Sequence, residues 1–411
     1  MIWIRDRADQ IHPTLDSLRY TYSQHQQRVA IQQDLYQHRT NWKVIGSFIS
    51  FTIFVMLLFT TVVGIPIILT EVRKRSVCSV TYHWVQYSTL NSSIHLCTAT
   101  ALWNPKGVTV AGLASGLPST SLAGLQFPHD IYVYGNGTIL VADYNNNRIT
   151  KWDPNATAGI LIAGTGSYGS SNILLAKPTA LAIRDKQLYV SDLENYRIQI
   201  FPLHSNASSP EAVTVIGRYG QGSDINQIDQ VTNLIVPTLY PSLLYMADSK
   251  NHRILVWDAE TDTTRLVAGE SGTFGFNPMQ LYNPIGIALD EKTNSLYIAD
   301  TFNNRVQKYD INERNSSMTV AGWGHLNHPY AVQLDPSGTN MFIADTFNHR
   351  ILVWTNGTRQ GRVIAGDNTP GNNAFQLNNP TQIRFDSNYN LYVVDTNNSR
   401  IQRFDLISNG C

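Results

Sequence analysis

The residues best placed to do chemistry are six aspartates that recur at a mean spacing of about 50 residues along the C-terminal part of the chain. Each is followed by an asparagine three positions later and an arginine five positions later, which defines the motif D-x-x-N-x-R. The copies are Asp143, Asn146, Arg148; Asp192, Asn195, Arg197; Asp248, Asn251, Arg253; Asp300, Asn303, Arg305; Asp345, Asn348, Arg350; Asp395, Asn398, Arg400. Six carboxylates around one axis could hold a metal ion, but each acid has its own arginine. The spacing therefore favours a structural role, in which each carboxylate accepts hydrogen bonds from the turn and from its arginine.

Each motif joins two predicted β-strands. An apolar run such as 296–299 precedes the aspartate, and a run such as 254–257 follows the arginine. Apolar residues on both faces are typical of strands that are covered on both sides. A third short strand ends at a glycine, as in VTVAG, and a fourth follows a proline, as in PIGIAL. Four strands in each repeat, without helical periodicity, predict an all-β propeller.

The order of the strands predicts how the ring closes. Six glycine-ended strands accompany the six motifs, but the first, at 108–112, precedes every motif, and the last motif has none after it. The first strand therefore completes the last unit, which closes a ring of six blades and hides the edges of an open sheet. In the third unit the candidate prolines, Pro237 and Pro241, lie 11 and 7 residues before Asp248, whereas the other units show 14 to 16. The sequence does not place the inner strand of this blade.

The succession V-A-G, P-x-x-I and L-Y-V-A-D-x-x-N-x-R-I resembles the NHL-repeat propellers over roughly residues 107–406. The resemblance implies a six-bladed β-propeller in which the Asp and Arg of the motif mainly maintain the architecture. NHL repeats serve many functions, so the resemblance implies a fold and leaves the activity open.

Histidines after the blade prolines would indicate an enzyme, because the peptidyl-amidoglycolate lyases, which are similar to these propellers, hold zinc in this way. Catalytic zinc usually has three protein ligands. Here only His129 occupies that place, and the other five positions hold Thr179, Thr238, Ile285, Tyr330 and Thr381. His325 and His328 have ligand-like spacing without a third partner, which favours solvated loop residues. We predict no cofactor and no lyase activity of this type; the alternative is a metal-dependent lyase or hydrolase, since loop acids and asparagines could form a calcium site without a linear motif.

The N-terminal part of the chain predicts a membrane anchor. Residues 1–43 are rich in Gln and Arg, and residues 44–70 contain no charged residue. Twenty residues from Val44 to Val63 would cover about 30 Å as a helix, enough to span a bilayer. A cleaved signal peptide is the alternative, but 43 residues precede the apolar run and no clean small-x-small site follows it. We predict a cytoplasmic tail at 1–43, a transmembrane signal anchor at 44–70, a stalk at 71–106 and the propeller at 107–411.

Glycosylation acceptors predict the orientation of this anchor. Basic residues lie on both sides of the span, and counting them alone slightly favours a cytoplasmic C-terminus. All seven N-x-S/T sites lie on the C-terminal side, at Asn91, Asn136, Asn155, Asn206, Asn315, Asn356 and Asn397. They predict a single-pass type II membrane protein with an extracellular or lumenal propeller.

The three cysteines, Cys78, Cys97 and Cys411, also follow the span, where an oxidising compartment would permit a disulfide. Ring closure brings the C-terminus near residue 107, so a Cys97–Cys411 pair is as reasonable as a Cys78–Cys97 pair. The remaining thiol would be able to link two chains into a dimer.

The charge balance argues against a nucleic-acid partner. From Gly107 onward there are 20 Lys and Arg against 25 Asp and Glu, and six of the arginines belong to the motifs. Phosphate binding requires a basic face. The chain has no Cys/His array for a zinc-binding ubiquitin-ligase module, no glycine-rich phosphate loop and no G-x-S-x-G sequence. By elimination, we predict a membrane-tethered binding or adhesion module for a protein or glycan ligand.

Three large apolar residues are candidates for the ligand contact. Phe302 and Phe347 occupy the same motif position in neighbouring blades, and Trp323 lies in the short linker between them. On one rim they would form an anchor, each contributing about 1.5–3 kcal/mol if fully buried by a partner. The alternative is that each phenylalanine packs against its own blade and Trp323 fills the gap between blades.

Overall fold

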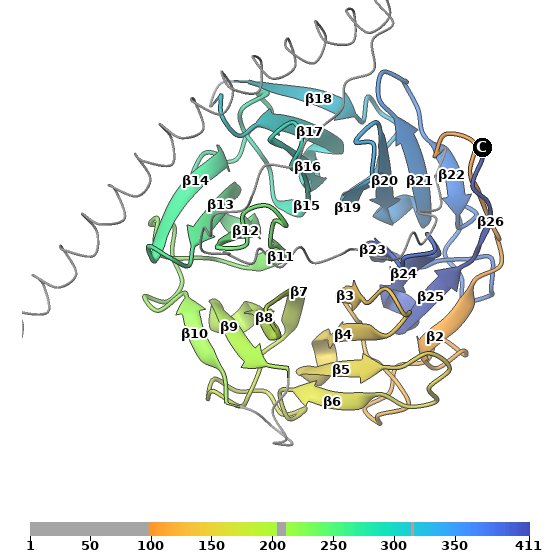
Figure 1. Ribbon diagram of the computed structural model, residues 1–411, viewed down its shortest axis with the longest axis horizontal. Helices are drawn as coiled ribbons and strands as arrows, with labels where there is room; N and C mark the ends of the chain where they lie inside the picture. The colour runs from red at the N-terminus through yellow and green to blue at the C-terminus, as the bar shows by residue number, and fades with distance from the viewer. Residues whose placement is uncertain (1–97, 204–210, 314–315) are drawn as a thin grey trace, which may run out of the picture. The chain divides into compact units, whose positions relative to one another are not determined.

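The computed structural model describes residues 98–203, 211–313 and 316–411. These residues form six four-stranded antiparallel sheets around a central axis, with one additional two-stranded pair (Figure 1). The predicted all-β, six-bladed propeller with four strands per blade is confirmed. The predicted tail, the span at 44–70 and most of the stalk lie outside the described residues, and no helix within the described residues is long and apolar enough to cross a membrane.

The blades follow one another along the chain, and each begins with the strand nearest the axis. Blade 1 contains β3 (Asp130–Val133), β4 (Ile139–Asp143), β5 (Arg148–Trp152) and β6 (Ile160–Ala163); blade 2 contains β7 (Pro178–Arg184), β8 (Gln187–Asp192), β9 (Arg197–Pro202) and β10 (Val213–Ile216); blade 3 contains β11 (Val231–Ile235), β12 (Leu243–Asp248), β13 (Arg253–Asp258) and β14 (Thr263–Gly269). Blade 4 contains β15 (Pro284–Asp290), β16 (Ser295–Asp300), β17 (Arg305–Asp310) and β18 (Ser317–Ala321); blade 5 contains β19 (Pro329–Leu334), β20 (Asn340–Asp345), β21 (Arg350–Thr355) and β22 (Arg362–Ala365); blade 6 contains β23 (Pro380–Phe385), β24 (Leu391–Asp395), β25 (Arg400–Phe404) and β2 (Val108–Gly112).

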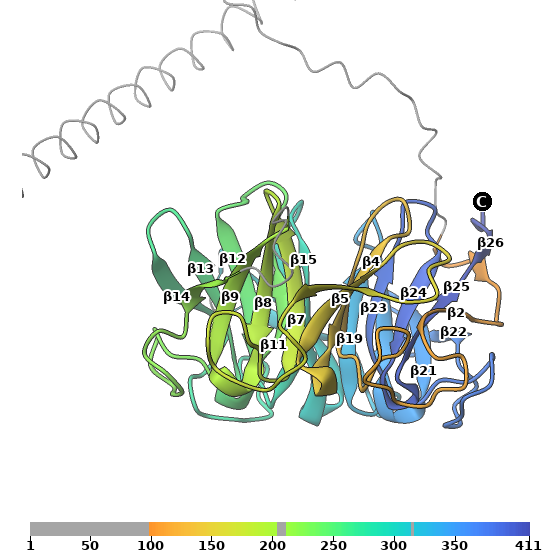
Figure 2. The same cartoon turned by 90° about the horizontal axis from the view of Figure 1, so that it is seen from below.

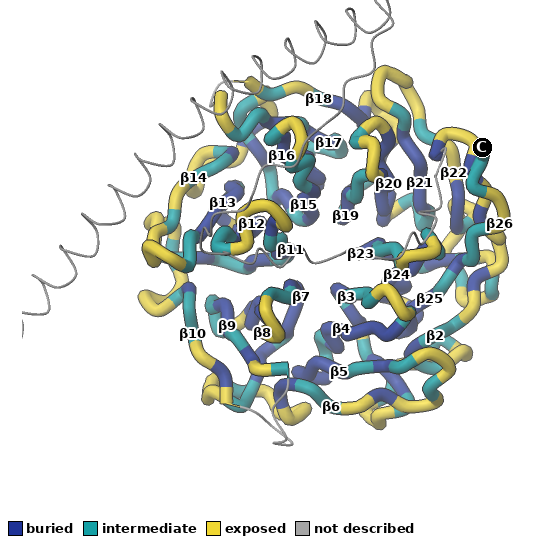
Figure 3. The backbone as a smooth tube through the Cα atoms, in the orientation of Figure 1, coloured by how far each residue is buried: buried dark blue, intermediate teal, exposed yellow. Residues whose placement is uncertain are grey.

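The second strand of each blade is mostly apolar and does not alternate between apolar and polar residues. Every residue of β4, β16, β20 and β24 is buried, because both faces of the strand are covered by neighbouring blades. Tyr245 and Ile254 of blade 3, for example, pack with Ile298 and Tyr309 of blade 4 in one apolar cluster. Figure 3 shows the result, with buried chain inside the blades and exposed chain in the turns and loops.

Ring closure occurs as the sequence predicts. β2 pairs antiparallel with β25, with Val108 opposite Arg403 and Gly112 opposite Arg400. β2 therefore completes the last blade, and every blade has four strands.

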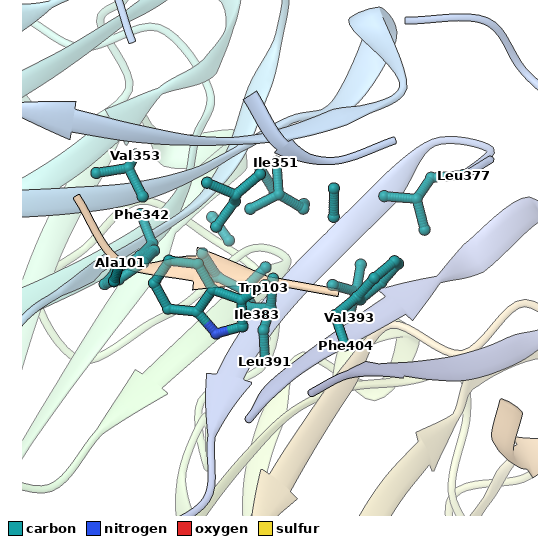
Figure 4. Packing of buried hydrophobic residues seen from close by; sticks show 14 residues of the cluster. Ala101, Trp103, Phe342, Ile351, Val353, Leu377, Ile383, Leu391, Val393 and Phe404 are labelled. Carbon is teal, nitrogen blue, oxygen red and sulfur yellow. The ribbon is translucent and has the colours of Figure 1, made fainter. Parts of the chain in front are cut away.

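A short strap reinforces this closure. β1 (Leu102–Trp103) pairs with β26 (Leu406–Ser408) beside blade 6. Trp103 is only 5% exposed, and its ring lies 5.7 Å from that of Phe342 of blade 5 (Figure 4). The same ring lies 6.3 Å from that of Phe385 of blade 6. Residues 101–103, which the sequence assigned to the stalk, thus belong to the packed unit. A two-residue strand carries no periodic signal that would have placed the boundary before residue 107.

Blade 3 differs from the prediction because it lacks the blade proline. Val231 lies opposite Asp248 in the register, as Pro284 lies opposite Asp300 in blade 4. Pro237 and Pro241 follow the inner strand β11 instead of preceding it. The residue equivalent to His129 in this blade is therefore Thr232, and the assignment of Thr238 to that position was wrong.

Candidate functional site

The propeller has two faces of different construction. One face, here called the turn face, carries the six D-x-x-N-x-R turns and the linkers between blades. The opposite face, here called the loop face, carries the loops that join the first strand to the second and the third to the fourth (Figure 2). The turns are short 3-10 helices: η1 (Tyr144–Asn146), η2 (Leu193–Asn195), η3 (Ser249–Asn251), η4 (Thr301–Asn303), η5 (Thr346–Asn348) and η6 (Thr396–Asn398).

The six motifs form one repeated network beneath the turn face. In each, the arginine Nε donates to the aspartate Oδ2 at 2.7–2.8 Å, and the asparagine Nδ2 donates to the same oxygen at 2.8–2.9 Å. The other oxygen accepts a backbone N–H from the preceding linker at 2.6–2.7 Å. Burial raises the pKa of Asp248, and the Asn251 and Arg253 bonds oppose this effect. Both oxygens of every motif acid are thus used by its own turn and by the linker that precedes its blade.

The remaining arginine nitrogens bind the linkers, to different extents. Arg253 is fully buried and donates to the carbonyls of Ser223, Asp224 and Gln227. Arg350 is 21% exposed and donates to the carbonyl of His325, in the shortest linker. A shorter linker offers fewer carbonyl groups to the same side chain.

The residue before each motif arginine joins neighbouring blades, a role that the sequence analysis missed. It adopts left-handed φ values of 48–57° in all six turns. In five turns its side chain accepts the backbone N–H of the residue that precedes the next blade's inner strand, a contact here called the junction clasp. The acceptors are Asn147, His252, Asn304, His349 and Ser399, with distances of 2.8–3.3 Å. Tyr196 of blade 2 provides no such bond among the described residues. The sequence signal for the clasp is that the position before the motif arginine holds Asn, His or Ser in the other five blades.

The predicted histidine position lies at the axis near the turn face. His129 stacks on Tyr144 with 4.3 Å between ring centroids, and burial lowers its pKa to about 4. The other five positions around the axis hold Thr179, Thr232, Ile285, Tyr330 and Thr381. Within the described ranges, no three His, Cys, Asp or Glu side chains are placed to hold a metal ion.

A cavity of about 620 Å³ opens along the axis at the loop face. Several of its charged residues make contacts between blades. The Glu291 carboxylate accepts the N–H groups of Thr238 and Leu239 at 2.8 and 2.6 Å, and the Lys292 Nζ donates to the Pro336 carbonyl at 2.6 Å. These contacts stabilise the mouth of the cavity, and its shape alone does not identify a ligand.

The most distinctive surface is a continuous row of aromatic side chains on the turn face of blades 3 to 5, here called the aromatic strip. Its members are His252, Phe274, Phe276, Tyr282, Phe302, His328, Tyr330 and Phe347. Tyr282 lies 4.6 Å from Phe274 and 5.1 Å from Phe302, measured between ring centroids. His328 lies 5.3 Å from Phe302 and 4.5 Å from Phe347, so it joins the turns of blades 4 and 5.

The aromatic strip remains open to solvent. Phe302 and Phe347 are 40% and 42% exposed, and Phe274 and Phe276 are 53% and 71% exposed. The structure therefore brings the predicted residues Phe302 and Phe347 together on one face. Trp323 is different, because it contacts Trp354 at 6.1 Å and has no ring contact with either phenylalanine. It lies outside the strip.

The four described glycosylation acceptors are all exposed. Asn136, Asn155 and Asn356 lie in loops of the loop face, and Asn397 lies in the turn of blade 6. Asn91, Asn206 and Asn315, like Cys78 and Cys97, lie outside the described residues.

Comparisons with known proteins identify the repeats. The NHL repeat family matches residues 125–152, 281–309 and 377–404, in blades 1, 4 and 6. NHL repeat-containing protein 2 of Bos taurus and that of Homo sapiens are each 25% identical over 234 residues, which cover 47% of this chain and 32% of each relative. The chain therefore matches about a third of the length of these relatives. A crystal structure of a protein of unknown function from Bacteroides thetaiotaomicron VPI-5482 has a TM-score of 0.55 at 16% identity, covering 73% of this chain and 76% of that one, which shows a shared fold.

Proposed function

We propose that this NHL-repeat propeller is a protein-binding module that docks its partner on the aromatic strip and is presented from a membrane in an extracytoplasmic compartment. The observation that carries the proposal is the strip itself, an unbroken row of eight rings with four partly exposed phenylalanines. Contiguous exposed apolar surface marks interaction sites, and aromatic residues supply most of the binding energy at protein interfaces.

The rest of the turn face supports this choice of site. At the motif position of Phe302 and Phe347, the other blades carry Asn145, Glu194, Lys250 and Asn397. The turns have the same backbone geometry in all six blades, so these differences are not required by the fold. A partner with an apolar surface would therefore meet a hydrophobic centre on blades 3 to 5 and a polar surround, which is the usual anatomy of a protein interface.

The described chain begins at the loop face. Thr98 donates from its hydroxyl to Asp335, in the loop between β19 and β20, at 2.9 Å. The proposed docking surface on the turn face therefore lies on the opposite side of the propeller from Thr98.

Two further features are consistent with this arrangement. Glycans on Asn136, Asn155 and Asn356 would cover the loop face and leave the aromatic strip free. Thr100 donates to the Gly410 carbonyl at 2.7 Å, so the start and the end of the described chain lie close together, as the proposed Cys97–Cys411 bond requires.

Site-specific photo-crosslinking on cells that express the full chain tests the site. A photoreactive phenylalanine analogue is placed at position 302 or 347, and at position 145 or 194 as matched controls in the equivalent turns. We expect a protein adduct from 302 and 347 and none from the controls. Equal adducts at all four positions would exclude the strip as the docking site, and an adduct that resists protease but not glycosidase would identify a glycan ligand.

The double substitution Phe302→Ser with Phe347→Ser then measures the contribution of the strip to binding of the crosslinked partner. Full burial of a phenylalanine is worth about 1.5–3 kcal/mol, and a partner can cover only the 40% and 42% of these side chains that are exposed. At roughly 1 kcal/mol for each side chain, we expect the affinity to fall about tenfold. The control is Asn145→Ser with Glu194→Ser, and all proteins are compared by thermal unfolding. Undiminished binding by a folded double variant would exclude this site.

Glycosidase digestion of protein made in secretory cells tests the compartment independently. We expect a clear increase in gel mobility, and a smaller increase when Asn136, Asn155 and Asn356 are replaced by Gln, because four of the seven predicted acceptors remain. Unchanged mobility, together with protection of the propeller from external protease, would contradict the proposed orientation without affecting the binding site.

A further inference from the structure

Two of the five junction clasps use histidine as the hydrogen-bond acceptor. His252 Nδ1 accepts the N–H of Asn283 at 3.1 Å, and His349 Nδ1 accepts the N–H of Asn379 at 3.2 Å. A ring nitrogen accepts a hydrogen bond only when it carries no proton, so both clasps require a neutral imidazole. Protonation of Nδ1 would place two N–H groups against each other and break the contact between blades.

These two clasps flank one part of the ring. His252 joins blade 3 to blade 4, and His349 joins blade 5 to blade 6. The junction between blades 4 and 5 depends on Asn304, whose Oδ1 accepts the N–H of His328 at 2.8 Å and does not titrate. Blades 4 and 5 carry Phe302 and Phe347, the centre of the aromatic strip.

The histidine at one end also belongs to the strip. His252 lies 5.7 Å from Phe274 and 5.6 Å from Tyr282, measured between ring centroids. A change at this clasp therefore reaches the exposed rings directly.

We propose that the propeller contains an acid-sensitive switch, in which protonation of His252 and His349 opens the two junctions that flank blades 4 and 5 and so disrupts the aromatic strip. Opening of the junctions is a property of the fold alone, whereas its effect on a partner rests on the proposed function. The blade pair 4–5 stays joined through Asn304.

The surroundings of both histidines favour the neutral form that the clasps need. Burial lowers the pKa of His252 from its usual 6.5, and the charge of Lys250 on the same turn adds to this effect. Burial lowers the pKa of His349 as well. The neighbouring arginines, Arg253 and Arg350, are paired with their motif acids. In the linker packed against His252, the ring of Tyr282 contacts the imidazole and Glu270 is the acid of the linker. In the linker packed against His349, the acid is Asp367.

The two histidines make the protein less stable in acid. The pKa of each histidine is lower in the folded than in the unfolded protein, so the unfolded state binds protons first as the pH falls. The stabilising contribution is fully present above about pH 6.5 and is lost as the pH falls toward the lower folded-state value. His328 also has a pKa lowered by burial, so its contribution must be separated by substitution.

The chain itself supplies the matched substitutions. Asn147 and Asn304 hold the same position in blades 1 and 4, so His252→Asn with His349→Asn retains an acceptor while removing its titration. The converse change, Asn304→His, introduces a titrating acceptor at the junction between blades 4 and 5. His328 is untouched in both variants.

Hydrogen exchange of the full chain at pH 7.5 and 5.0, corrected for the intrinsic effect of pH, measures each junction without a partner. A junction hydrogen bond is worth about 0.5–1.5 kcal/mol. We therefore expect protection of peptides that contain Asn283 and Asn379 to fall about twofold to tenfold at pH 5.0, with a smaller change in the peptide that contains His328. The double Asn variant should lose the acid effect, and Asn304→His should extend it to the third peptide.

Equal acid sensitivity in the parent and the double Asn variant would overturn the switch, as would equal loss of protection at all three junctions in the parent. The two proposals fail separately. If the junctions open as expected but the binding of the crosslinked partner does not change, the switch stands and the strip is not the docking site.

Discussion

The turn face consists of a buried layer, in which the residue types are constant from blade to blade, and an exposed layer, in which they vary. In the buried layer, Asp, Asn and Arg recur six times with the same hydrogen bonds. In the exposed layer, the residue two positions after the aspartate changes from Phe302 and Phe347 to Asn145 and Glu194 on an unchanged backbone. Burial makes the first layer uniform, because an unpaired charge there is costly. The second layer is free to vary, and its variation is where binding specificity can be encoded.

The largest effect is expected from the buried layer. Arg253→Ala leaves the fully buried Asp248 without its cation and leaves several linker carbonyls unpaired, so we expect a loss of about 3–5 kcal/mol in the free energy of unfolding. Urea denaturation measures the change. Arg350→Ala is the matched comparison. Asp345 is as buried as Asp248, but Arg350 is 21% exposed and donates to one linker carbonyl instead of three, so we expect a smaller loss. Equal losses would show that the unpaired acid, and not the linker carbonyls, sets the cost.

A smaller change, this time a gain in stability, is expected at the position before the motif arginine, where the junction clasp forms. Tyr196→Asn would supply the acceptor that the junction between blades 2 and 3 lacks, and Asn tolerates the left-handed backbone better than Tyr. We expect a gain of about 0.5–1.5 kcal/mol in the free energy of unfolding. Tyr196→Ala offers no acceptor and should give no gain. A loss of stability in both variants would mean that the packing of the tyrosine outweighs the clasp.

The smallest effect on stability is expected in the exposed layer. Lys250→Phe places a third phenylalanine at the position of Phe302 and Phe347 and extends the aromatic strip on blade 3. Because the site is exposed, we expect the free energy of unfolding to change by no more than about 0.5 kcal/mol, as judged by urea denaturation. A loss above about 1 kcal/mol would show that the fold also constrains the exposed layer.

The sequence predicts the ring well because its signals are repeated. The six motifs, the glycine-ended strands and the unpaired first strand together predict the blade number and the closure through Val108–Gly112, both of which are confirmed. In blade 3 the proline does not mark the inner strand, because Pro237 and Pro241 follow β11. A buried apolar residue three positions earlier is the better marker: Leu281 precedes Pro284, and Ile228 precedes Val231 by the same spacing. The proline only restricts the backbone, whereas the apolar side chain anchors the linker in the core.

The candidate site was predicted only in part. Phe302 and Phe347 stand out because they share a motif position, and the structure places them together. Phe274, Phe276 and Tyr282 lie in a linker of ordinary length, at positions where the linkers of the other blades hold other residues, so the repeat pattern does not point to them. Trp323 lies between the two phenylalanines along the chain, but its side chain contacts Trp354. The sequence does not specify the direction in which a short linker points its side chains.

The pairing of β2 with β25 has a consequence for biosynthesis. Thr109 and Gln402, which meet in this pair, are 293 residues apart in the chain. At roughly 5–20 residues per second, the ribosome needs on the order of 15–60 s to deliver the second strand after the first. During that interval five blades can assemble while the first strand remains without its partner and the growing sheet keeps an open edge. Translation speed and chaperones that bind exposed strands are therefore expected to influence the yield of this protein more strongly than the stability of its finished ring would suggest.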